Sequence, residues 1–162
     1  MRNLVRASVL LLALGLSEPV LAGPLEDARA AYDKQDYTTA LRLLRPLAAQ
    51  GDADAQFHLG VMYQVGQGVP QDYAQAVKWY RLAADQGDAD AQMALGHMYD
   101  LGQGVPRDAV EAHKWFNLSA ARTSVDEEYV REAVKNRNHV AEGMTPAQIA
   151  EAQKRASAWR PK

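Results

Sequence analysis

The 162-residue sequence contains no cysteine. A chain without cysteine cannot form a disulfide framework, and it offers no thiolate ligand to a metal ion. Its four histidines form no H-E-x-x-H pattern, and its D-x-D pairs are not completed as they are in a calcium-binding loop. We therefore expect a fold that is stabilised by packing alone, with no metal and no cofactor.

The sequence also lacks an apolar run long enough to cross a membrane. Its longest run covers residues 7–16, whereas a membrane-spanning helix needs about 20 residues. Arg2 and Arg6 precede this run, and a cleavage site follows at Ala22, which is the layout of a secretory signal peptide. We expect residues 1–22 to be removed and the mature protein to be periplasmic or secreted, without membrane insertion. An uncleaved anchor is the alternative, whereas a lipid anchor is disfavoured because no cysteine lies at the cleavage site.

An excess of charge of one sign is missing as well. Without residues 1–22 the chain has 16 basic and 19 acidic residues. Binding to nucleic acid or to an anionic membrane surface requires a clear basic excess or a basic stripe. This balance argues against nucleic acid as a partner. The remaining residues, 23–162, have the length of a single domain.

The most informative feature that is present is an internal repeat. Residues 50–85 and 86–121 are two copies of one unit and agree at 22 of 36 positions without a gap. A unit of this length cannot bury its apolar face alone, so neighbouring units must stack to complete the core. Residues 24–49 are interpreted as a degenerate upstream repeat with a short turn at 33–36. Residues 122–160 are expected to cap the other end.

Each unit is predicted to contain two helices joined by a turn. Apolar residues recur at helical spacing in both halves. The turn, residues 66–72 in the first full unit, has two glycines, a proline and a final aspartate, which end one helix and cap the next. Gly60 and Gly96 lie inside the first helices, where glycine costs about 1 kcal/mol relative to alanine. We expect the missing side chain to let the second helix approach closely around Tyr63 and Trp79.

Two further helices are predicted after the repeats. The first begins at a capping box that runs from Ser124 to Glu127. The second begins at Thr145, followed by proline and, three residues on, by Gln148. Its expected buried stripe is Ile149, Ala152, Ala156 and Trp159.

The pattern A-x-x-x-L-G-x-x-Y-x-x-G-x-G-V-P-x-D occurs at residues 55–72 and again at residues 91–108. This pattern resembles the Sel-one-like repeat family, which is related to the tetratricopeptide repeats. The resemblance implies an all-α protein, an α/α superhelical solenoid of tetratricopeptide-like helical hairpins with C-terminal capping helices. It also implies an adaptor or scaffold role without common catalytic machinery. One cysteine-rich branch of that family is linked to β-lactam hydrolysis, but its paired cysteines have no counterpart in this sequence.

If the first helix of each unit lines the concave side, as in the tetratricopeptide repeats, candidate binding residues can be named. They share the face of the first helix that is left after the core positions are assigned, and they differ between the two copies. Such variation is expected from partner specificity, although drift at an unconstrained surface looks the same. The expected partner-binding residues are Phe57, Val61, Gln64, Met93, His97 and Asp100.

Residues of the repeats could also suit a metal site, acid/base chemistry or sugar binding. His97 and Asp100 share a helix face and would suit a metal or an acid/base role, but a polar groove residue is the simpler reading. The recurring aromatic residues would suit a sugar-stacking platform if exposed, but aromatic residues at helical spacing usually belong to the core. We predict no catalytic residues and an exported, non-enzymatic module that binds a protein or peptide in its concave groove. The alternatives are a binding module for an envelope glycan or a small molecule and, less favoured, a hydrolase; oligomeric state and partner identity stay open.

Overall fold

The structure is a computed structural model that describes residues 23–121 and 126–162. These residues form helices and no strand, which confirms the all-α prediction. The predicted signal peptide lies outside the described residues and stays a prediction. The helices are α1 (Pro24–Asp33), α2 (Tyr37–Ala49), α3 (Ala53–Val65), α4 (Tyr73–Asp85), α5 (Ala89–Leu101), α6 (Ala109–Ala120), α7 (Glu127–Glu142) and α8 (Pro146–Ala158).

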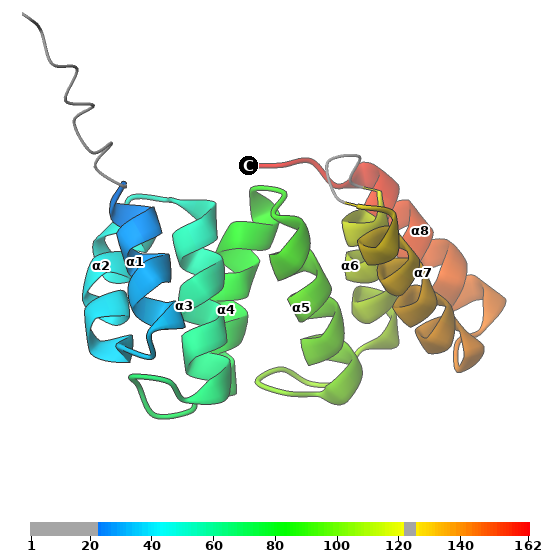
Figure 1. Ribbon diagram of the computed structural model, residues 1–162. Helices are drawn as coiled ribbons and strands as arrows, with labels where there is room; N and C mark the ends of the chain where they lie inside the picture. Colours follow the sequence, from blue (N-terminus) through cyan, green and yellow to red (C-terminus); the bar gives the residue numbers. More distant parts are fainter. Residues whose placement is uncertain (1–22, 122–125) are drawn as a thin grey trace, which may run out of the picture.

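Successive helices pair into hairpins that stand side by side in an arc (Figure 1). The pairs are α1 with α2, α3 with α4 and α5 with α6, and the second helix of each hairpin also packs against the first helix of the next. Helices α7 and α8 both pack against α6 at the end of the stack. The predicted α/α solenoid with C-terminal capping helices is therefore confirmed.

Aspartate and glycine set the helix ends in each unit. Asp52 accepts a hydrogen bond from the Ala55 amide at 2.8 Å, and its copy Asp88 accepts one from the Ala91 amide at 2.7 Å. These carboxylates satisfy amides that have no partner within the helix. At the other end of α3, Gly66 adopts a left-handed conformation with φ of 80°, which glycine tolerates without steric penalty.

The two capping helices begin with different N-caps. The predicted start of α7 at Ser124 falls outside the described residues. Helix α7 begins at Glu127, where Asp126 accepts a hydrogen bond from the Tyr129 amide at 2.7 Å. The capping box predicted for α8 is confirmed, since Thr145 and Gln148 exchange hydrogen bonds between side chain and backbone.

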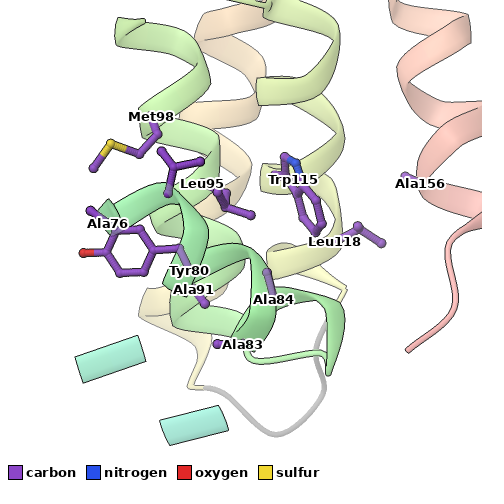
Figure 2. Close-up of a cluster of buried hydrophobic side chains, with 11 residues drawn as sticks. Ala76, Tyr80, Ala83, Ala84, Ala91, Leu95, Met98, Trp115, Leu118 and Ala156 are labelled. Carbon is purple, nitrogen blue, oxygen red and sulfur yellow. The ribbon is translucent and has the colours of Figure 1, made fainter. Parts of the chain in front are cut away.

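Aromatic rings from the second helices fill the core. Tyr80, Trp115 and Phe116 are each about 1% exposed. Figure 2 shows Tyr80 and Trp115 among small and aliphatic side chains of α4, α5, α6 and α8. Trp79 is only partly buried, yet it packs against the neighbouring cluster formed by α1, α2 and α3. The repeated aromatic residues therefore serve packing, as the sequence indicated.

The glycines inside α3 and α5 make room for two of these rings. A Cβ on Gly60 would lie 2.5 Å from ring carbons of Tyr80, and a Cβ on Gly96 would lie 2.5 Å from the Phe116 ring. The steric role predicted for the glycines is supported by this geometry. The rings that need the space are Tyr80 and Phe116, however, and not the Tyr63 and Trp79 rings that the sequence analysis named.

Buried glutamines connect neighbouring hairpins. The Gln56 side chain in α3 donates to the Ala48 carbonyl at the end of α2, at 3.1 Å. Its copy Gln92 in α5 donates to the Ala84 carbonyl at the end of α4, at 3.2 Å. Both carbonyls lie in the last turn of their helix, where each also accepts from a following backbone amide, that of Gly51 at 3.1 Å or that of Gly87 at 2.9 Å. The repeat therefore carries its own link from one hairpin to the next.

The residues after α8 return to the middle of the stack (Figure 1). The Lys162 amide donates to the Asp85 carbonyl at 2.9 Å, and its ammonium group lies 2.7 Å from the Asp85 carboxylate. Trp159 packs against the core cluster that α4, α5 and α6 share. This segment ties the cap to α4.

We expect Gly60→Ala to lower the free energy of unfolding by about 1–3 kcal/mol, because the added methyl group has to displace the buried Tyr80 ring. At an unobstructed helix position the same change would raise stability by about 1 kcal/mol. Gly143→Ala is the control, since the nearest atom to its Cβ is 3.8 Å away. Thermal melts followed by circular dichroism make the comparison. A Gly60→Ala protein that melts at or above the parent temperature contradicts the steric argument.

Candidate functional site

A cavity of about 430 Å³ lies between the first helices of the second and third hairpins. We call it the α3–α5 cavity. Helices α3 and α5 supply two of its walls, α4 supplies one side chain, and the loop after α5 supplies another. Its lining residues are Phe57, Val61, Gln64, Tyr80, Asp90, Met93, Ala94, His97, Leu101 and Gln103.

Five of the six residues expected to bind a partner line this cavity. They are Phe57, Val61, Gln64, Met93 and His97. The first three belong to one repeat and the last two to the next. Equivalent positions of the two repeats are 36 residues apart in the sequence, and the structure brings them together. Asp100 does not line the cavity.

Tyr80 forms one wall because Gly60 leaves space for its ring. The ring lies 5.8 Å from the Phe57 ring, measured between centroids. Its hydroxyl donates to the Gln64 side-chain oxygen at 2.5 Å. Burial raises the pKa of Tyr80, so the hydroxyl stays protonated and remains a donor. The bond holds the Gln64 side chain at the cavity edge.

The equivalent positions in the next unit are arranged differently. Phe116 replaces Tyr80 and has no hydroxyl, so the residue at the position of Gln64, Asp100, receives no such bond. The Asp100 carboxylate instead lies 3.4 Å from one guanidinium nitrogen of Arg107. The backbone carbonyl at this position is bound alike in both units: that of Asp100 accepts from Arg107 Nε at 2.7 Å, and that of Gln64 accepts from the Gln71 side chain at 2.8 Å. Asp100 lines a different pocket, together with Arg107 and with His139, Val140 and Glu142 of α7.

His97 is half-buried at the α5 wall. Its ring meets the Phe116 ring edge to face, with centroids 5.0 Å apart, and its Nε2 lies 3.4 Å from the side-chain nitrogen of Asn136 in α7. Burial lowers the pKa of His97, and the nearby Glu132 and Asp100 carboxylates offset part of that effect. His97 is therefore an uncharged polar group at neutral pH.

Met93 presents only a small part of its side chain to the cavity. It is 9% exposed and packs with Ala112 and Phe116 in a core cluster that also includes residues of α7. Its sulfur lies 3.6 Å from the same Asn136 nitrogen that approaches His97. Capping helix α7 therefore borders the α5 side of the site.

His97 and Asp100 each have contacts other than with one another. His97 contacts Phe116 and Asn136, while Asp100 is engaged by Arg107, so the two do not act as a pair. Among residues 23–121 and 126–162, no group of three or more His, Asp or Glu side chains is placed to hold a metal ion. None of the helices in these ranges is long and apolar enough to span a membrane.

Sequence reasoning missed several lining residues. Tyr80 was assigned to the core, and Gln103 was read as part of a turn. Ala94 lies three residues before His97 and Leu101 lies four residues after it, so all three share one helix face. That spacing was the signal in the sequence that could have identified Ala94 and Leu101. Asp90 lies on the expected face but was not selected as a site residue.

A family model described as Sel1 repeat matches residues 30–52, 53–88 and 89–124. A crystal structure of a protective antigen of uropathogenic Escherichia coli with an SLR fold is similar to this chain, with 30% identity and a TM-score of 0.77 over 84% of the chain. A Sel1 repeat protein from Oxalobacter formigenes is also similar, with 28% identity and a TM-score of 0.65 over 84% of the chain. This chain spans 29% and 56% of the length of those two chains. No curated protein matches the sequence.

We expect acidification to destabilise the protein, and His97→Val to reduce that effect. The pKa of His97 is lower in the folded state than in the unfolded state, so the unfolded chain binds more protons below about pH 6.5. Stability therefore falls as pH drops through that value. The first full repeat carries Val61 at the equivalent position, so valine suits the scaffold. Melting temperatures between about pH 7.5 and pH 5.5 test this.

His139→Gln is the control for this comparison, because the His139 side chain is 76% exposed. It should keep the parent's dependence on pH. An unchanged pH dependence in His97→Val would show that burial of His97 does not contribute to the acid sensitivity.

Proposed function

The chain belongs to the Sel1 repeat family, whose members generally act as protein–protein interaction modules, and from this premise we propose that the α3–α5 cavity binds a segment of a partner protein. The family fold is typically a non-enzymatic scaffold. We propose the same role here, an adaptor with no reaction of its own. Export to the periplasm or the cell exterior is part of this proposal, and the pattern of Arg2, Arg6 and residues 7–16 supports it.

The observation that carries the proposal is an apolar cavity with fixed aromatic walls. Phe57 and Tyr80 stand against each other, and the Gln64 bond holds the Tyr80 hydroxyl. Leu101 at the edge is 62% exposed, so it extends the apolar surface of the cavity. Preformed apolar surfaces of this kind accept anchor side chains of a partner at little conformational cost.

The dimensions suit a short segment. The helical rise from Asp90 to Leu101 is about 16 Å, which matches about five extended residues or about three turns of a helix. One or two apolar side chains from such a segment would enter the cavity. Such a segment would bind as peptides do in other apolar grooves, through a few apolar anchor side chains.

A small molecule or a glycan fragment is a second candidate. The cavity volume of about 430 Å³ lies in the range of small-ligand pockets, which runs from about 300 to 1,000 Å³. Lining residues with amide and carboxylate groups would orient such a ligand. The experiment below separates the two candidates.

We expect the double variant Val61→His, Ala94→His to lose its protein partners while it keeps its fold. The other repeat carries histidine at both equivalent positions, His97 and His58, so the scaffold accepts the residue. The added rings fill the cavity. Proteins that crosslink to the mature chain are identified by mass spectrometry and purified. Fluorescence anisotropy then compares their affinity for the parent with their affinity for the variant. Loss of binding by about tenfold or more is expected.

Val65→His is the matched control, because Val65 is 55% exposed on α3 and does not line the cavity. It should bind as the parent does. Equal binding by all three proteins contradicts the proposed site. Cosedimentation with purified peptidoglycan that the double variant loses, without any such protein partner, would favour the glycan candidate.

A further inference from the structure

We infer that the partner segment carries a lysine or arginine beside its apolar anchor, and that Asp90 is the residue that pairs with this cation. This inference rests on the proposed function and adds the chemistry of the ligand. It depends on the charges at the cavity and on the position of Asp90 relative to the apolar walls.

The cavity lining carries a single formal charge at neutral pH, and that charge is negative. Asp90 is the only acidic residue in the lining, and neither lysine nor arginine lines the cavity. His97 is uncharged, because burial lowers its pKa. A ligand with a carboxylate would therefore meet an uncompensated like charge, whereas a cation would find an acceptor.

Asp90 is exposed and available for such a pair. Within the described residues it forms no ion pair with an arginine or a lysine. The Tyr129 hydroxyl donates to the Ala89 carbonyl at 2.6 Å. Burial is the main reason that the pKa of Tyr129 is raised, and both the negative charge of Asp90 and a side-chain hydrogen bond with it contribute. This contact is with a neutral phenol, so it does not neutralise the Asp90 charge.

In the adjacent repeat, an arginine neutralises the equivalent aspartate. Asp54, which occupies the same position in α3, lies 3.2 Å from the guanidinium group of Arg29 in α1. The same Arg29 donates to His58, at 3.4 Å. Arg29 is therefore already engaged. The copy of Asp54 at position 90 is the one left for an external cation.

The charges around His58 are mixed. Burial and then Arg29 lower the pKa of His58, while Asp54, Asp33 and Asp90 oppose them. Because Arg29 pairs with Asp54, the attraction of a cation depends on Asp90 itself. On the α7 side, Glu132 also raises the pKa of His97. An acidic group beside an apolar cavity attracts cationic ligands and raises their rate of association.

The positions of Asp90 and Leu101 also give the ligand an orientation. Asp90 lies in the first turn of α5, close to one end of the cavity, and Leu101 is the last residue of that helix. A segment bound along the α3–α5 cavity would therefore place its cation near the start of α5 and its apolar side chains toward Leu101. Val61 and Ala94 lie between these ends.

A random-peptide phage library selected on the mature protein tests the inference. Each round includes a counter-selection on the cavity-filled variant Val61→His, Ala94→His, so that only peptides that need the cavity remain. We expect the enriched peptides to carry lysine or arginine beside leucine, phenylalanine or tryptophan. One such peptide, synthesised with a fluorophore, is then measured by anisotropy. Asp90→Asn should weaken it about two- to fivefold, and added salt should weaken the parent complex toward the same value.

Two variants complete the design. Asp27→Asn is the control, because Asp27 is also an exposed aspartate in the first turn of a helix but does not line the cavity. It should bind the peptide as the parent does, which separates the pair from any effect on the helix dipole. Asp90→Lys should reverse the selection and enrich peptides with glutamate or aspartate.

The outcomes distinguish this inference from the proposed function. Cavity-dependent peptides without basic residues, or with affinity unaffected by Asp90→Asn, would overturn the inference and leave the peptide-binding function standing. A library that yields no cavity-dependent peptide would overturn both. Basic peptides that bind the cavity-filled variant equally well would show that the acidic surface attracts them without the cavity, which also overturns the inference.

Discussion

The structure depends on one steric relation, in which an aromatic ring of the second helix occupies the space that a glycine leaves in the first. The relation occurs twice, between Gly60 and Tyr80 and between Gly96 and Phe116. Glycine weakens a helix by about 1 kcal/mol, while full burial of a phenylalanine side chain stabilises a fold by about 1.5–3 kcal/mol. Burial of the ring therefore more than offsets the helix stability that is lost at the glycine. In the first of these units the inserted ring is also a wall of the α3–α5 cavity, so folding and the candidate site share one determinant.

A single hydroxyl group accounts for much of the difference between the two units. Where the inserted ring is Tyr80, its hydroxyl holds Gln64 at the cavity edge. Where the ring is Phe116, that partner is missing, and Asp100 pairs with Arg107 instead. The differences at these positions are thus coupled through internal contacts, and partner specificity is not needed to explain them. His97 also has internal contacts, with Phe116 and with Asn136 of α7, so its difference from Val61 does not require partner specificity either.

Helix periods, turn residues and the repeat itself were enough to predict the helices, the stacking and the start of α8, because each depends on neighbours in sequence. The same periods placed Phe57 and His97 on one face. They did not identify Tyr80 as a cavity wall, because its direction depends on a close approach between helices. Gln56 and Gln92 were also missed, since a buried glutamine is recognised only when the carbonyl it satisfies is known.

A site that is made by two hairpins links binding to the cooperativity of the stack. In a solenoid, stability is approximately a sum over the hairpins and the interfaces between neighbours. Helices α3 and α5 are joined through α4, which packs against both. A ligand held between Val61 and Ala94 would contact both first helices at once and would strengthen the interface between them. Ligand binding would then raise the free energy of separating the second hairpin from the third, and changes that loosen α4, including those at Gly60, would weaken binding without touching the ligand.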